Sequence, residues 1–516
     1  MTMTPPADER VSADVRDRAS RTGGHIDALD AEQPSTAGAA DASRSGREAP
    51  RGPGMRTVLA GGLVVGILAV LVRIAAVPLS NFDTYFHLRF GSEFLHQWSL
   101  RNPGSVSTFA TEPWLPTQWL PEVVMARMEE SLGLAGVAWL FGVQLVSLAL
   151  GLFVLARRWV APLTAGLLVV VALLASSTGL SMRPQTWSFL LVAVTAGAWF
   201  RTREDGQLRW WLIPLTWLWA MVHGMWPLGI GIGLVAIAGL ALDRPTGRPS
   251  TGRALLVPCL SAVAAALTPV GPRLYGAVLG VGARKQYFAE WGRPDFTHGS
   301  VMVLAGFLAL TVVIMSRQSR RGWFELTFLL LAGGCAVWSW RTVPVSAMLL
   351  VPIAAQQVGS ARDARPHRAA RSEKTLLVIA GVIALSSLAV IVPHTSEEPP
   401  PQPRWLDSAL GALPPGTKVF GEWRWGNYLM WRYPQLDLLM HGYGDTFTTA
   451  ELQRNTDITE LAPGWDDQLR KTGCTIAVLP PDDPVAYALD HQLGWRVLKK
   501  SPDVEELRAP ADWMAE

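Results

Sequence analysis

Long apolar segments recur along most of this chain and constrain its fold more than any other feature. From Thr57 onward, eleven of them approach the roughly 20 residues that a helix needs to cross a bilayer. They cover 57–79, 134–156, 160–179, 185–200, 210–223, 225–242, 254–270, 300–316, 323–340, 342–358 and 375–393. Hydrophobic residues make up 49% of the chain and charged residues only 17%, which excludes a soluble protein of this length. The sequence predicts a polytopic α-helical membrane protein.

Basic residues between the apolar segments predict the orientation of the chain. If the N-terminus is cytoplasmic, every basic loop obeys the positive-inside bias. The inner clusters are then Arg157 and Arg158; Arg201, Arg203 and Arg209; Arg244, Arg248 and Arg253; Arg317, Arg320 and Arg321; and Arg362, Arg365, Arg368, Arg371 and Lys374. The outer face carries the loop 80–133, the turn 182–185, the loop 271–299 and everything after about position 394. We expect the functional site on that face.

Three segments lie outside the apolar part, which spans 55–393. Residues 1–54 nearly lack aromatic side chains and predict a disordered cytoplasmic segment. The Pro-rich stretch 394–403 predicts an extended linker. Residues 404–516 predict a small extracytoplasmic α/β domain. Its expected strands are 418–420, 437–440, 475–479 and two more from Trp495. Its expected helices are 449–461, 464–470 and 485–493, and 427–432 is expected to be either a short helix or an extended turn.

Asp83 stands just after the first apolar segment, followed by aromatic residues, His87 and Arg89. An acid with basic neighbours at the mouth of a membrane helix costs stability, and such costs point to function. His87 lies one helical turn after Asp83 and shares its face if this stretch is helical. Asp83 could also cap that helix, since Asp is a favoured N-cap residue, and capping is compatible with catalysis.

Several stretches of the chain resemble known membrane glycosyltransferases. The stretch 82–89 resembles the first outer-loop motif of oligosaccharyltransferase catalytic subunits. The stretch 423–428 resembles, more loosely, their Trp-Trp-Asp-Tyr-Gly acceptor motif, although the Asp is missing and the order differs. From about 57 to 510, the chain is most similar to bacterial multi-pass proteins placed with the GT-C glycosyltransferases. The shared patches are 118–122, 183–185, 219–224, 268–275, 290–296 and 341–344.

This resemblance implies a GT-C-like helical fold in a bacterial plasma membrane and an inverting transfer of sugar. The donor it implies is a polyprenyl-phosphate-linked sugar, with Asp83 as general base. The expected phosphate ligands are the outer-face arginines at helix ends, Arg183, Arg273 and Arg341. The expected supporting residues are His87, Arg89, Glu122, Gln185, His223, Tyr275 and Glu290, and the expected acceptor contacts are Trp423, Trp425, Asn427 and Tyr428. Membrane lipid is a further expected partner, the acceptor is a glycan or a protein, and no nucleic acid is expected.

Each of these assignments has a purely structural alternative. The three arginines could snorkel to lipid headgroups. Glu122 could start an amphipathic helix at 121–131, where acids favour the N-terminus. His223 could be a packed residue at a helix end, and Glu290 a solvated loop charge. Trp423 and Trp425 could belong to the domain core or anchor it at the membrane interface.

The sequence leaves the use of a metal open. Oligosaccharyltransferases hold a divalent ion with outer-loop carboxylates that include an Asp-x-Asp type pair. No such pair stands in 80–133, where Glu93, Glu112 and Glu122 are scattered. We therefore expect catalysis without a metal, with Mg²⁺ or Mn²⁺ as the alternative.

Two other function classes compete with a glycosyltransferase. A transporter would need a polar path through the spans, and the apolar segments show neither that path nor an internal repeat. A scaffold that binds a lipid-linked glycan without catalysis would tolerate replacement of Asp83. A transport assay distinguishes the transporter from the glycosyltransferase. Replacement of Asp83 distinguishes the non-catalytic scaffold from the glycosyltransferase.

Overall fold

The computed structural model describes residues 55–243, 250–318, 322–361, 370–395 and 403–514. All of them belong to one compact unit, Pro53–Glu516. The segment 1–54 and positions 396–402 of the expected linker lie outside the described residues. So do seven of the arginines used for orientation, namely Arg244, Arg248, Arg320, Arg321, Arg362, Arg365 and Arg368.

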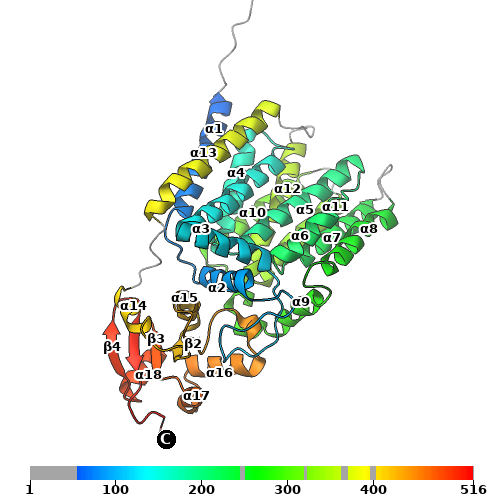
Figure 1. Cartoon of the computed structure of the whole chain (residues 1–516). Coiled ribbons are helices and arrows are strands. Elements are labelled where there is room, and N and C mark those ends of the chain that lie inside the picture. The colour runs from blue at the N-terminus through cyan, green and yellow to red at the C-terminus, as the bar shows by residue number, and fades with distance from the viewer. Residues whose placement is uncertain (1–54, 244–249, 319–321, 362–369, 396–402, 515–516) are drawn as a thin grey trace, which may run out of the picture. The chain divides into compact units, whose positions relative to one another are not determined.

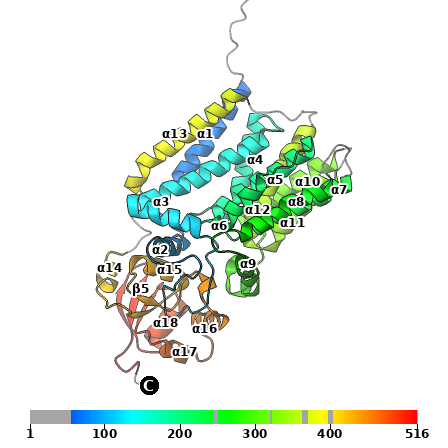
Figure 2. The ribbon, with the colours of Figure 1, turned by 45° about the vertical axis from the view of Figure 1, so that its right-hand side comes forward.

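Helices form most of the chain up to Thr395 (Figures 1 and 2). They are α1 Met55–Ala75, α2 Asp83–His96, α3 Trp119–Ala156, α4 Pro162–Ala175, α5 Gln185–Asp205, α6 Leu212–Val222, α7 Pro227–Asp243, α8 Thr251–Ala266, α9 Leu274–Ala283, α10 Gly299–Ser316, α11 Trp323–Trp338, α12 Val343–Ser360 and α13 Arg371–Thr395. Short 3-10 turns lie between them: η1 Ser177–Gly179, η2 Lys285–Tyr287, η3 Ala289–Trp291 and η4 Trp340–Thr342. Each of the eleven predicted apolar segments falls on one of these helices.

Within the part of the chain that the structure describes, five stretches are long and apolar enough to cross a membrane, judged by length and composition. They are α1, α3, α10, α13 and Trp340–Ser360, which contains α12. Five further apolar helices are shorter, namely α4, α6, α7, α8 and α11. The prediction of a mostly helical membrane protein is confirmed at this level, and the count of eleven crossings stays a prediction.

The helices differ in how they are packed. Nearly all of α12 is buried, which makes it the central helix of the membrane part. By contrast, α1 and α13 pack against α3 and against each other but expose most of their apolar surface, including Val65 and Ile383. Exposed apolar surface of this extent suits contact with lipid chains.

The start of α3 agrees with the sequence prediction of an amphipathic helix at 121–131 and a separate span at 134–156. Both stretches lie within α3, and its helical backbone is interrupted between them at Gly133, which adopts φ 63° and ψ −164°. A backbone with positive φ favours glycine, so this residue permits the change of direction. Figure 2 shows the two parts of α3 at different angles.

Several of the expected inner-face arginines form ion pairs between helices. Arg157 Nε lies 2.5 Å from Glu373 Oε1 and joins the end of α3 to the start of α13. Arg203 Nη1 lies 2.5 Å from Glu325 Oε1 and joins α5 to α11. Pairing explains how these charges fit at helix ends, while the side of the membrane that they occupy stays a prediction.

The C-terminal region folds around a five-stranded sheet. The strands are β1 Lys418–Gly421, β2 Asp437–Leu438, β3 Ile476–Leu479, β4 Arg496–Lys500 and β5 Glu505–Arg508, in the order β2-β1-β3-β5-β4. The pairs β1–β2 and β1–β3 are parallel, and the pairs β3–β5 and β4–β5 are antiparallel. The helices are α14 Trp405–Leu410, α15 Trp423–Arg432, α16 Thr449–Thr459, α17 Trp465–Thr472 and α18 Pro484–His491, with η5 Gly444–Thr446 before α16.

The expected small α/β region is confirmed, with two differences. The sequence did not predict α14, and α15 begins at Trp423 rather than at position 427 because Glu422 caps it, accepting the Arg424 N–H at 3.1 Å. This earlier start puts both tryptophans of the 423–428 motif on the helix.

Helix α15 packs directly on α2, and Figures 1 and 2 both place these helices side by side. The ring centroids of Phe82 and Trp425 are 5.4 Å apart, and those of Tyr85 and Tyr428 are 5.1 Å apart. Edge-to-face aromatic pairs of this kind add about 0.5–1.5 kcal/mol each to area burial. This contact connects the sheet region to the first residues after α1.

Candidate functional site

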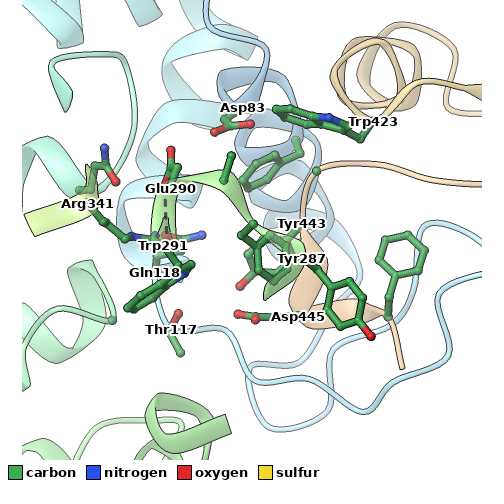
Figure 3. A pocket seen from close by; sticks show the side chains of 18 of the residues that line it. Asp83, Thr117, Gln118, Tyr287, Glu290, Trp291, Arg341, Trp423, Tyr443 and Asp445 are labelled. Atoms are coloured by element: carbon green, nitrogen blue, oxygen red, sulfur yellow. Dashed lines mark ion pairs between the residues drawn. The ribbon is translucent and has the colours of Figure 1, made fainter. Parts of the chain in front are cut away.

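A cavity of about 1000 Å³ lies where the C-terminal region meets α2, α5, α7 and α9 (Figure 3). Its polar walls include eight of the residues that the sequence singled out: Asp83, His87, Arg183, Gln185, His223, Glu290, Arg341 and Trp423. These residues are spread over 340 positions, so the tertiary fold has gathered them. We treat this cavity as the candidate site.

Asp83 is the first residue of α2, and its side chain is not used as a cap. The Oδ1 atom of Asn81 accepts the Asp83 N–H at 2.9 Å, and the N-cap residue Phe82 makes no side-chain cap bond. Asp83 exposes only 20% of its side chain and receives two other hydrogen bonds. Arg183 Nη1 donates to Oδ2 at 2.8 Å, and Asn427 Nδ2 donates to Oδ1 at 3.2 Å. Capping by this side chain, one of the alternatives above, therefore does not occur.

Arg183 holds two carboxylates together. It precedes α5, and its Nε donates to Ser181 Oγ at 2.9 Å, which fixes the guanidinium. Its Nη1 lies 2.8 Å from Asp83 Oδ2 and 2.5 Å from Glu290 Oε1. The second oxygen of Glu290 lies 3.9 Å from Arg341 Nη1. Two acids and two guanidinium groups thus alternate along one wall, so their charges largely balance.

The two carboxylates of this wall differ in their affinity for protons. Burial raises the pKa of Asp83 above its usual value, although the charge of Arg183 acts in the opposite direction. Burial acts in the same direction on Glu290, but there Arg183 and Arg341 outweigh it and leave the pKa below its usual value. Asp83 is therefore the better proton acceptor of the pair.

Two histidines support the same wall. His87 Nδ1 lies 2.9 Å from Glu122 Oε1, and both side chains are buried. Burial, together with the charge of Arg183, lowers the pKa of His87 well below its usual value, so this ring is neutral at neutral pH. His223 Nδ1 accepts the Met225 N–H at 3.3 Å, which leaves the ring proton on Nε2 if the ring is neutral.

Some of the predicted residues do not reach the cavity. Arg273 is not among the lining residues, and its Nη2 donates to the Arg101 carbonyl at 2.6 Å. The hydroxyl of Tyr275 donates to the Ala262 carbonyl. Arg89 forms an ion pair with Glu93 within α2, at 2.7 Å. These contacts give the three residues structural partners outside the cavity.

The 423–428 motif is divided between cavity and core. Trp423 lines the cavity and is 47% exposed, and Asn427 reaches Asp83. Trp425 and Tyr428 are buried against α2, with 8% and 1% exposure. An acceptor could touch these two rings only if α15 left α2, so the closed packing agrees with their structural alternative.

The sequence prediction missed the segment after β2, which supplies Tyr443 and Asp445 to the cavity. Burial raises the pKa of the Asp445 carboxyl. The flanking glycines are needed here, because a Cβ on Gly442 would lie 2.6 Å from Asn427 Nδ2 and one on Gly444 would lie 2.0 Å from a Phe288 ring carbon. The available signal in the sequence was a pair of glycines, Gly442 and Gly444, directly before an acid and shortly after a predicted strand.

The cavity does not fit a divalent metal ion. In the part of the chain that the structure describes, no group of three or more His, Cys, Asp or Glu side chains could hold one. The Asp83 and Glu290 carboxylates instead share the Arg183 guanidinium. The Mg²⁺ or Mn²⁺ alternative therefore has no ligand set made of three such side chains among these residues.

No protein-family description and no curated protein matches this sequence. Solved structures do match, with low identity. The apo oligosaccharyltransferase of Archaeoglobus fulgidus gives a TM-score of 0.49 at 10% identity and covers 82% of this chain and 69% of its own. ArnT of Cupriavidus metallidurans bound to undecaprenyl phosphate gives 0.47 at 14% identity, covering 88% and 98%. The archaeal oligosaccharyltransferase AglB of A. fulgidus, in complex with an inhibitory peptide and a dolichol-phosphate, gives 0.48 at 11% identity, covering 87% and 76%.

All three identities are below 15% and all three TM-scores are below 0.5. At TM-scores below 0.5 these structures define neither the activity nor the substrate of this chain.

Proposed function

We propose that this chain is a GT-C type membrane glycosyltransferase that moves a sugar from a polyprenyl-phosphate-linked donor to an acceptor hydroxyl, with inversion. One observation carries the proposal. Asp83, a mostly buried carboxylate oriented by a guanidinium and an amide, faces a cavity that also offers a second guanidinium and an apolar wall. A lipid-phosphate-linked sugar needs a base, a cation and an apolar groove in that combination.

The apolar wall suits the lipid part of the donor. It is formed by Pro227, Leu228 and Gly231 of α7 and by Ala277 and Val278 of α9. Burying a lipid chain contributes about 0.8 kcal/mol per CH₂ group, so a few isoprene units supply substantial affinity. None of these five residues carries a polar side-chain group that would make burial of the lipid chain unfavourable.

Arg341 is the best placed cation for the donor phosphate. It exposes 28% of its side chain, and its contact with Glu290 is long at 3.9 Å, whereas Arg183 is held by two carboxylates. A guanidinium binds phosphate through paired N–H donors. His223, which also lines the cavity, adds an Nε2–H donor when it is neutral. Together they neutralise the phosphate as it leaves.

The chemistry then balances as a single displacement. The acceptor hydroxyl gives its proton to Asp83, and its oxygen forms a bond to the anomeric carbon. The bond from that carbon to the phosphate oxygen breaks, and polyprenyl phosphate leaves with the electron pair. Each Asp83 oxygen accepts one hydrogen bond, from Arg183 or Asn427, so each retains a lone pair for the proton. A raised pKa brings this carboxylate closer to the range of an effective base.

The same proposal includes the arrangement in the membrane. Residues 55–393 form a membrane domain of about eleven crossings, with outer loops 80–133 and 271–299. The N-terminus is cytoplasmic, and the region 404–516 covers the site on the outer face of a bacterial plasma membrane. This arrangement puts the cavity on the side to which the donor's sugar is exported.

The test compares wild type with Asp83→Asn in a deletion strain, by profiling envelope glycans and exported glycoproteins. Asparagine keeps the shape and removes the base, so we expect wild type alone to restore the missing sugar. The matched control is Asp467→Asn, the same change at an exposed position in the first turn of α17. Equal restoration by Asp83→Asn would eliminate Asp83 as the base and favour the scaffold. Accumulated lipid-linked sugar on the inner face would favour the transporter.

A further inference from the structure

One arm of the cavity is built by a single face of α16. Residues 452, 453, 455, 456, 459 and 460 line it, and this spacing of three and four puts them on one side of the helix. The arm also contains Tyr287 from η2 and Asp445 from the segment after β2 (Figure 3). Apart from Leu452, all of these side chains carry hydroxyl, amide or carboxyl groups. The arm is therefore much more polar than the wall formed by α7 and α9.

The side-chain amide of Asn455 is a hydrogen-bond donor beside the cavity. The residue is 8% exposed, and its Oδ1 accepts weak bonds of 3.4 Å from Arg454. Its Nδ2 donates to no group among the described residues. An amide N–H group beside a cavity can donate to an acceptor atom of a ligand or to water. Asn455 lines the cavity, so an acceptor atom of a ligand can reach it.

The neighbouring threonines offer the opposite chemistry. Thr456 Oγ1 donates to the Leu452 carbonyl at 3.0 Å, and Thr459 Oγ1 donates to the Asn455 carbonyl at 3.0 Å. Their protons are thus engaged within the helix, and the hydroxyl oxygens are left as acceptors. The arm consequently presents a donor and several acceptors within one helical turn.

The aromatic side of the arm is held in place. The Tyr287 hydroxyl donates to Gln453 Oε1 at 3.0 Å, and Gln453 Nε2 donates to Asp457 Oδ1 at 2.8 Å. A tyrosine ring fixed at its polar edge offers an apolar face beside polar groups. Such a surface suits a ligand that has both C–H faces and hydroxyls.

Charge narrows the class of ligand. The only guanidinium groups among the described lining residues are Arg183 and Arg341, and both lie next to Glu290. The arm itself adds only the acids Asp445 and Glu460, so it disfavours an anion. An ammonium group has no lone pair and cannot accept from Asn455, whereas a sugar hydroxyl both donates and accepts.

We propose that this α16 arm, defined by Tyr287, Asp445, Asn455, Thr456, Thr459 and Glu460, binds the acceptor, and that the acceptor is an uncharged, hydroxyl-rich glycan. The acceptor surface is then α16 rather than the Trp423–Arg432 helix. This proposal rests on the proposed function, because it names the substrate that Asp83 deprotonates.

The test measures binding with the full-length protein in lipid nanodiscs. The probes are neutral linear tetrasaccharides of glucose, mannose, galactose and arabinose, together with one amino-sugar and one uronic-acid tetrasaccharide, followed by saturation-transfer NMR. We expect a neutral tetrasaccharide to bind wild type. Asn455→Leu and the isosteric Thr456→Val should each weaken it about three- to tenfold. The matched control Thr449→Val changes an exposed threonine of the same helix and should have no effect.

Three results would overturn the proposal: no neutral glycan binds, the amino-sugar or uronic-acid probe is preferred, or Thr456→Val and Asn455→Leu bind as wild type does. If Asn455→Leu fails to fold, Thr456→Val alone decides. Undecaprenyl phosphate binding, measured on the same samples, separates this proposal from the proposed function. Glycan binding without lipid-phosphate binding contradicts the donor assignment, and lipid-phosphate binding without glycan binding contradicts only the α16 arm.

Discussion

Replacement of Asn427 by Asp tests whether this side chain sets the proton affinity of Asp83. Asn427 is fully buried, and its Nδ2 donates to Asp83 Oδ1 at 3.2 Å while its Oδ1 accepts the Gly442 N–H at 2.6 Å. Aspartate has nearly the same size and still accepts from Gly442. The change therefore replaces one donor to Asp83 with a second carboxylate oxygen and leaves the packing intact.

The distance gives the size of the effect. Two unit charges 3.2 Å apart repel by about 5 kcal/mol at an effective dielectric constant of roughly 20. This corresponds to about four pH units. Arg183 screens part of it, and one proton shared by the two acids relieves more, so we expect an apparent rise of about one to three pH units. The sign is upward, because a neighbouring negative charge favours the protonated form of Asp83.

The assay is the pH dependence of kcat/KM for release of polyprenyl phosphate. Activity needs ionised Asp83, so the ascending limb of the profile should move to higher pH in Asn427→Asp, with activity lost at neutral pH and recovered under alkaline conditions. Asn102→Asp adds the same charge at an exposed position and should leave the limb in place. An unmoved limb in Asn427→Asp would refute the coupling between Asn427 and the base.

Three further changes probe the rest of the cavity. Glu290→Gln removes a negative charge that raises the pKa of the general base, so the ascending limb should move to lower pH by roughly half to one unit, read from the same profile. Arg341→Ala should raise the donor KM about 10- to 100-fold with little change in the acceptor KM, whereas Arg273→Ala, outside the cavity lining, should leave both unchanged. Gly231→Phe fills open space on the apolar wall and should weaken undecaprenyl phosphate binding at least about tenfold in a direct binding assay. The control Gly306→Phe, on an exposed face of α10, should leave this binding unchanged. Equal binding by both variants would contradict a lipid chain on α7.

The sequence predicted the helical part well because its signal is local. A run of apolar residues must satisfy its own backbone hydrogen bonds where water is absent, and a helix does so within the run. All eleven segments accordingly lie on helices. The break in α3 was predicted too, because the sequence separated a helix at 121–131 from a span at 134–156, and the non-helical Gly133 lies between them.

The residues of the candidate site could be predicted only in part from the sequence. Asp83, Arg183 and Arg341 were named from their positions at the outer ends of apolar segments, and Glu290 from the patch 290–296 in the outer loop 271–299. The structure brings all four to one wall. Their roles stay proposals. Arg273 occupies a comparable position along the chain, yet its guanidinium turns to the Arg101 carbonyl, which no local pattern predicts.

By itself, the sequence determined the class of this protein, the positions of its apolar helices and of most elements of the C-terminal region, and the acid around which a site could form. These features depend on composition and on contacts between near neighbours in the chain. Only the tertiary structure decided that Asn427, 344 positions away along the chain, donates a hydrogen bond to Asp83. It also decided that Trp425 and Tyr428 are buried in packing and that α16 lines the cavity. Such contacts arise when α15 docks on α2, and a docking geometry follows from the complementary shapes of two surfaces rather than from the pattern of either one.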